Sequence, residues 1–312
     1  MAVSCATALV ASVLGCMLTS ITAPGIGGIS IAVMAILAAM SPVPIYWHEK
    51  GHEDRRESTL VILWAVVLAA ILRYPLLIAA RLRMPLRDSL FASIDRSLGV
   101  NVPAIVQWAV RHSWVGIVLN NSYSLLLPLL LIAIFLPALA GKRKEAQEFI
   151  VSNGIAFAIA VPLFTLFPAV GPWAVYHFAA RMDQQQCESL LLALRISRTF
   201  LAMPGQDAAI MCFPSFHVVW AVLSARSLWG FRSLRIPASA LAALILISTM
   251  TTGWHYFVDV LGGLAVAVVS ILVAKSYLLG MHASRGWLST SPFERAPAEV
   301  CNIKVKGIAA QR

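Results

Sequence analysis

The sequence predicts an all-α membrane protein, a polytopic bundle of about eight crossing helices. The chain has 312 residues, of which 59% are hydrophobic and 12% are charged, and its mean hydropathy is +0.80. An ordinary soluble domain has roughly 25% charged residues, about twice as many. Each apolar run is close to the roughly 20 residues that a helix needs to cross a bilayer. This composition excludes a soluble globular protein, a disordered chain and a nucleic-acid-binding domain of ordinary composition.

The predicted elements follow one another as apolar runs separated by short polar clusters. The runs occupy about residues 3–20, 29–47, 59–80, 122–140, 149–168, 214–231, 236–252 and 255–279. A Pro/Gly break at residues 21–28 means that the first two runs can also form one irregular pair. The first run lacks a basic start, which favours an uncleaved crossing over a signal peptide. Residues 84–119 mix charged and apolar side chains and are expected to lie at the interface as an amphipathic region.

The predicted organisation has N-terminal membrane helices over residues 1–80, a membrane core over 81–280 and a mobile tail over 281–312. Lys and Arg are more frequent in the tail and in the KRK loop at 142–144 than in the short loops on the other side. Because such residues stay in the cytoplasm, the tail is expected there, and the long loop at 169–213 is expected outside. The expected location is the inner, or plasma, membrane.

One acidic residue, Asp259, lies inside a predicted crossing, where carboxylates usually mark a functional site. It follows His255 by four residues in TTGWHYFVDVLGG, a spacing that places both side chains on one face of a helix. A carboxylate beside an imidazole fixes the ring tautomer and stabilises the charged ring. Taken alone, the pair also fits a buried hydrogen bond that only joins helices.

A second histidine lies at the start of the sixth predicted crossing, in CFPSFHVVWAV. Pro–Ser before an apolar run predicts a helix start capped by Ser215, with His217 in the first turn. One crossing separates this helix from the eighth, so the two helices are parallel and His217 and His255 lie at the same membrane face. Helix N-termini attract anions, so the constellation suits phosphoryl transfer, with one histidine attacking phosphorus and the other protonating the leaving oxygen.

FPSFH and TGWHYFVDV resemble the second and third signature motifs of the type-2 phosphatidic acid phosphatase (phosphatase–haloperoxidase) superfamily. The resemblance covers about residues 90–280 and is strongest to the branch with inositol phosphorylceramide synthase and sphingomyelin synthase. LFPAVGPW, at 166–173, is similar to the Pro/aromatic motif of the inositolphosphotransferases in that branch. The resemblance implies a six-helix core and a site without metal or cofactor. It also implies that His255 is the nucleophile, that Asp259 orients it, and that His217 is the general acid.

Two departures from the superfamily bear on phosphate binding. The first motif, Lys-x6-Arg-Pro, is absent, and Thr249 stands where an arginine often precedes the nucleophile by six residues. Both departures favour the phosphotransferase branch. A phosphate still needs cationic donors, and arginine suits bidentate binding best. Arg195 is the preferred candidate, Arg198 and then Arg181 follow it, and Ser215 is a further phosphate-binding candidate. The alternative is that these arginines face lipid headgroups.

The expected function is therefore a membrane enzyme that acts on a phospholipid or isoprenoid phosphate ester. It would hydrolyse the phosphate or pass the phospho-headgroup to a lipid alcohol, as in sphingolipid metabolism. The alternative is a proton-coupled transporter with His255 and Asp259 as a relay, although such relays usually lie near the membrane midplane. A third interpretation is a metal enzyme with two histidines and a carboxylate, but the chain lacks the several His-rich boxes of membrane di-iron oxygenases.

Overall fold

The computed structural model describes residues 21–22, 38–196, 200–201 and 210–289 of the chain. Four parts of the prediction lie outside the described residues: the first predicted crossing, the first half of the second, Arg198 and the end of the predicted tail. The described helices are α3 (Pro42–Glu49), α4 (Glu53–Arg81), α5 (Asp88–Ser97), α6 (Val102–Arg111), α7 (Ser113–Ser124), α8 (Leu126–Leu139), α9 (Arg143–Leu166), α10 (Pro172–Tyr176), α11 (Met182–Ile196), α12 (Phe216–Leu228), α13 (Arg235–Thr251) and α14 (Phe257–Ser289). The strands β1 (Ile21–Thr22) and β2 (Phe200–Leu201) pair in parallel. The predicted all-α class is confirmed.

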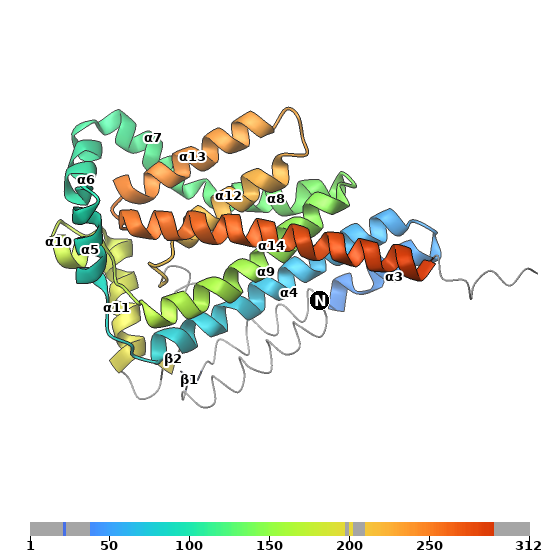
Figure 1. The fold of residues 1–312 in the computed structure, drawn as a ribbon, viewed down its shortest axis with the longest axis horizontal. Helices are drawn as coiled ribbons and strands as arrows, with labels where there is room; N and C mark the ends of the chain where they lie inside the picture. The colour runs from blue at the N-terminus through green and yellow to red at the C-terminus, as the bar shows by residue number, and fades with distance from the viewer. Residues whose placement is uncertain (1–20, 23–37, 197–199, 202–209, 290–312) are drawn as a thin grey trace, which may run out of the picture.

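A bundle of six helices forms the body of the described structure. Helix α4 packs on α8 and α9, and α12 packs on α8, α9, α13 and α14. The core between them is apolar, because fully buried side chains such as Leu77, Phe164, Leu223 and Ile245 come from four of these helices. Helices α5, α6, α10 and α11 gather at one end of the bundle (Figure 1). That end also receives the turn between α13 and α14.

Within the described residues, three helical segments are long and apolar enough to cross a membrane. They are Ser113–Leu139, formed by α7 and α8, Arg143–Leu166 of α9, and Phe257–Gly280 of α14, while α12 and α13 are shorter apolar helices. These segments overlap the predicted runs at 122–140, 149–168 and 255–279. By length and composition the first apolar segment begins at Ser113, so it includes the last seven of the residues, 84–119, that are expected at the interface. The earlier start follows because charge ends at Arg111 and His112, and the sequence SWVGIVLN carries none.

Candidate active site

The turn between α13 and α14, hereafter the α13–α14 turn (residues 252–256), is tight because a glycine permits it. Gly253 has a φ of +76°, and a Cβ at this position would lie 2.9 Å from the ring of Phe178. Only glycine adopts such a backbone at no steric cost. The carbonyl of Thr249 then accepts the N–H groups of both Trp254 and His255, at 3.2 Å each. Backbone hydrogen bonds to the end of α13 therefore fix the position of His255.

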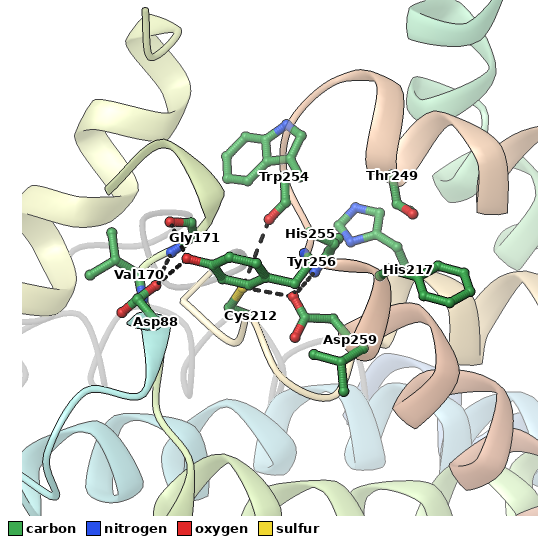
Figure 2. Close-up of polar contacts among 12 residues, drawn as sticks. Asp88, Val170, Gly171, Cys212, His217, Thr249, Trp254, His255, Tyr256 and Asp259 are labelled. Atoms are coloured by element: carbon green, nitrogen blue, oxygen red, sulfur yellow. Dashed lines mark hydrogen bonds and ion pairs between the residues drawn. The ribbon is translucent and has the colours of Figure 1, made fainter. Parts of the chain in front are cut away.

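The structure brings His217, His255 and Asp259 together at one end of the bundle (Figure 2). The imidazole rings of His217 and His255 lie 5.9 Å apart between centroids, and His255 Nδ1 lies 3.4 Å from Asp259 Oδ2. His217 is the second residue of α12, as predicted. His255, however, precedes α14 and belongs to the α13–α14 turn, so the expectation that it stacks with Asp259 on one helix is wrong. The two side chains meet because the turn folds back over the first turn of α14.

Several groups converge on the buried carboxylate of Asp259. Its Oδ2 accepts the backbone N–H of Tyr256 at 2.8 Å and the thiol of Cys212 at 3.1 Å. Its backbone carbonyl accepts the N–H of Ser215 at 3.0 Å, which joins the start of α12 to α14. The His255 contact is longer than an ordinary hydrogen bond, which is common for such pairs before substrate binds. Asp259 is thus fixed in place beside His255.

Cys212 is a neighbour of the site that the sequence reading did not assign to it. Cys212 and Cys187, which belong to the same loop region before α12, are both free thiols. The ligand atoms of Cys212, His255 and Asp259 all lie within 4.8 Å of one another, a set that could hold a soft cation. The thiol donates to Asp259, however, and a buried thiol in that position keeps its proton.

Tyr123 of α7 packs directly on His217. The two rings stack with centroids 4.3 Å apart and planes 20° apart, and the Tyr123 hydroxyl lies 3.4 Å from His217 Nδ1. The Trp254 ring lies nearly parallel to the Tyr123 ring, with centroids 6.2 Å apart. These rings, His255 and Cys212 line a cavity of about 40 Å³. Such a volume holds only a water or two, so a lipid phosphate enters only if the lining side chains shift.

The predicted phosphate-binding residues occupy different places. Ser215 is the N-cap residue of α12 as predicted, but its side chain makes no capping bond, and its buried Oγ has no partner among the described residues. Arg195 donates from Nη2 to the carbonyl of Met84 at 2.6 Å and does not line the cavity. Arg181 lines a second, larger cavity of about 510 Å³. Of these candidates, Ser215 lies nearest the two histidines along the chain.

Two further carboxylates reach the site from α5 and were not expected there. Asp88 and Asp95 are buried, with 7% and 0% of their surface exposed, and both contact the residues that directly follow His255. The sequence signal that could have found them is their spacing. They are seven residues apart, which places both on one face of a short helix together with the apolar Phe91 and Ala92.

An apolar helical bundle that gathers two histidines and an aspartate at one end defines an integral-membrane enzyme of the phosphatase type. A family model described as the PAP2 superfamily matches residues 89–273, more than half of the chain. This protein belongs to the PAP2 superfamily, which is the superfamily that the motifs predicted. Comparisons with curated proteins and with solved structures give no match. Membership supports phosphatase-type activity on lipid phosphates.

Proposed function

We propose that this protein transfers the phosphoryl group of a membrane lipid phosphate through a phosphohistidine formed at His255. The observation that carries the proposal is the meeting of His217 and His255 at one cavity, with the buried Asp259 carboxylate 3.4 Å from Nδ1 of His255. Three different segments supply these residues, namely the start of α12, the α13–α14 turn and the first turn of α14. A purely structural His–Asp pair does not need the second histidine.

The proposed reaction has two steps. Because Nδ1 of His255 faces Asp259, the other ring nitrogen is free to attack phosphorus. The new N–P bond replaces the P–O bond to the leaving alcohol, and His217 donates a proton to that oxygen. Water or an acceptor hydroxyl then attacks phosphorus, the N–P bond breaks, and His217 takes the proton from the attacking oxygen.

The start of α12 is the proposed place for the phosphate oxygens. The first N–H groups of a helix lack partners within the helix and attract anions. At α14 this position is filled, because Asp95 accepts the N–H groups of Phe257 and Val258. At α12 the Ser215 side chain makes no capping bond, which leaves its hydroxyl available to a phosphate. Arg198, the second arginine candidate, lies outside the described residues.

The second cavity favours transfer of a headgroup over simple hydrolysis. Its lining is mixed: apolar residues such as Val106 and Phe178 lie beside the polar Asn120, Gln184, Thr252 and Arg181, and the Arg181 guanidinium is already paired with Asp183. Uncharged polar groups beside a neutralised cation suit an uncharged, hydroxyl-bearing group better than a second phosphate. In headgroup transfer this group stays bonded to phosphorus through both steps and needs a pocket of its own.

The two cavities are close enough to serve one substrate. Asn120 of the second cavity and Tyr123 of the first are three residues apart on α7, a rise of about 4.5 Å. Thr252 of the second cavity and His255 of the first belong to the same turn. We therefore propose an inositolphosphotransferase-like reaction, with ceramide or diacylglycerol as the acceptor alcohol. An isoprenoid phosphate would be handled as a substrate for hydrolysis.

One assay separates these outcomes. Purified protein in detergent is given labelled phosphatidic acid or labelled phosphatidylinositol, with and without ceramide or diacylglycerol. A new labelled lipid that requires the acceptor supports transfer, whereas free phosphate alone overturns transfer and leaves hydrolysis. The His255→Ala variant is expected to be inactive. The exposed His177 at the end of α10 has a φ of +52°, which asparagine tolerates, so His177→Asn is a matched control.

The transporter alternative predicts a different result from the same variants. A proton relay through His255 and Asp259 would leave no phosphoryl chemistry to lose. If the His255→Ala variant turned over lipid phosphate at the wild-type rate, the proposed enzyme mechanism would be wrong. The pair lies at the end of the bundle, beside the starts of α12 and α14 rather than midway along them, which favours the enzyme.

A further inference from the structure

Helix α5 presents two buried carboxylates to the chain that surrounds His255. Asp88 and Asp95 lie two helical turns apart and therefore on the same face. The other face of the helix is exposed: Ser89, Leu90, Ser93, Arg96 and Ser97. Burying a carboxylate is costly unless hydrogen bonds satisfy it, so the partners of these two residues show what the helix does.

Asp95 caps α14 from a distant part of the sequence. Its Oδ2 accepts the N–H of Phe257 at 2.8 Å, and its Oδ1 accepts the N–H of Val258 at 3.0 Å. These are the first two residues of α14 and lie between His255 and Asp259. Burial raises the pKa of Asp95, and the two N–H groups partly offset this effect. The positive end of α14 stabilises the buried carboxylate in return.

Asp88 holds the residue that follows His255. Its Oδ1 lies 3.1 Å from the hydroxyl of Tyr256, whose side chain is fully buried. The same carboxylate accepts the N–H groups of Val170 at 3.0 Å and Gly171 at 2.9 Å. Figure 2 shows these groups on the side of Tyr256 away from Asp259. Asp88 therefore joins the segment before α10 to the α13–α14 turn.

We propose that Asp95 is a positioning residue for the reaction, supported by Asp88. Neither carboxylate is expected to touch the substrate. Asp95 fixes the backbone between His255 and Asp259, and so sets the distance and direction between the imidazole and the carboxylate. The activity part of this inference rests on the proposed function. The structural part, that Asp95 protects two particular amides, does not.

The variant that tests the inference most cleanly is Asp95→Asn. Asparagine has nearly the same shape, but its amide nitrogen cannot accept one of the two N–H groups. Hydrogen–deuterium exchange should therefore become faster at residues 257 and 258. With a lipid phosphate substrate, kcat per folded enzyme should fall at least tenfold while KM changes less than twofold, because misplacing a reacting group affects the chemical step. Asp95→Ala, which removes both acceptors, should lose more kcat than Asp95→Asn.

Ser93→Ala is the matched control. Ser93 lies on the exposed face of α5, and its hydroxyl bonds only to the carbonyl of Leu90 in the same helix. This variant should keep wild-type exchange and wild-type kcat. Thermal unfolding in detergent gives the folded fraction by which each kcat is divided, so a variant that is merely less stable is recognised. Asp95→Asn keeps the test usable even if Asp95→Ala does not fold.

Two results would overturn the proposal. Unchanged exchange at residues 257 and 258 in Asp95→Asn would show that Asp95 does not hold α14, whatever the activity. Faster exchange with wild-type kcat per folded enzyme would show that the cap is structural alone. If the wild-type protein turned over no lipid phosphate, the proposed function would fail. The structural part would still be tested, because a wild-type exchange rate in Asp95→Asn would show that Asp95 does not cap α14.

Discussion

At the scale of single residues, Asp259 holds the site together. Its carboxylate contacts His255, Tyr256 and Cys212, and its backbone carbonyl contacts Ser215. A neutral amide at this position could keep some of these contacts but could not stabilise a positive charge on His255. We therefore propose that Asp259 has an electrostatic as well as a structural role.

The Asp259→Asn variant tests this role. We expect kcat to fall by roughly 10²- to 10⁴-fold, the usual contribution of acid–base machinery, with a smaller change in KM. Steady-state kinetics with phosphatidic acid measure both. The buried Ser248, whose hydroxyl bonds only to Ile245 of its own helix, supplies the control variant Ser248→Ala. Activity of Asp259→Asn within threefold of wild type would remove Asp259 from the mechanism.

The stacking of Tyr123 on His217 predicts a graded effect. Tyr123→Phe keeps the stacked ring and loses only a 3.4 Å contact, so its kcat should stay within about threefold of wild type. Tyr123→Ala removes the ring. An aromatic pair contributes about 0.5–1.5 kcal/mol, so kcat should fall by about 2- to 13-fold as His217 loses its support. Equal kcat values for the two variants would argue against a role for the stack.

The buried set of Cys212, His255 and Asp259 gives a prediction about metals. If His255 acts as the nucleophile, activity should be unchanged after dialysis against a chelator such as EDTA. Vanadate, which mimics a phosphate under attack, should inhibit competitively. Loss of activity in chelator with recovery on adding Zn²⁺ would instead favour a metal site at Cys212, His255 and Asp259.

At the scale of elements, the sequence predicted the parts that depend on local patterns. The four-residue spacing predicted that His255 and Asp259 lie together. The parallel direction of the two helices that begin near His217 and His255 predicted that both histidines lie at the same end of the bundle. Asp95 was missed because its partners are more than 160 residues away, and no local pattern encodes that contact. Tyr123 was missed for the same reason. Arg195 was preferred because phosphate needs a cation, but the structure places its guanidinium on the carbonyl of Met84.

The α9–α12 contact carries a prediction about stability. Arg226 of α12 contacts the carboxylate of Glu148 of α9 through both Nε and Nη2, each at 3.0 Å, and Glu148 is buried. Glu148→Ala leaves the guanidinium without this partner. We expect a loss of about 1.5–3 kcal/mol, the range for hydrogen bonds to charged groups. Thermal unfolding in detergent measures it, with the exposed Glu49→Ala as the control that should change little.

At the scale of the whole molecule, the charge distribution sets the orientation. We propose that the end of the bundle with His217 and His255 faces the extracytoplasmic side of the plasma membrane, and that the C-terminus is cytoplasmic. Lys142, Arg143 and Lys144 lie in the turn and first residues that lead into α9. Such basic clusters mark the cytoplasmic side. The net charge of +10 then reflects membrane anchoring more than substrate binding.

Cysteine labelling in intact cells tests this orientation. Gln185 lies in α11 near the proposed site, and Lys144 lies in α9; both side chains are exposed. A membrane-impermeant maleimide should label Gln185→Cys above the wild-type background and should label Lys144→Cys only after the cells are broken. The reverse pattern would place the site on the cytoplasmic side.

The central claim is that a phosphohistidine forms at His255 during turnover. Stopping the reaction rapidly without acid, and then locating the phosphate, tests this claim most directly. The purified enzyme is mixed with phosphatidic acid labelled at phosphorus, unfolded in alkaline detergent within one turnover, digested, and examined by mass spectrometry. Phosphate should appear on His255, stable to base and labile to acid, and should be absent from His255→Ala. Phosphate on His217 instead, or turnover without any phosphate bound to the protein, would contradict the mechanism.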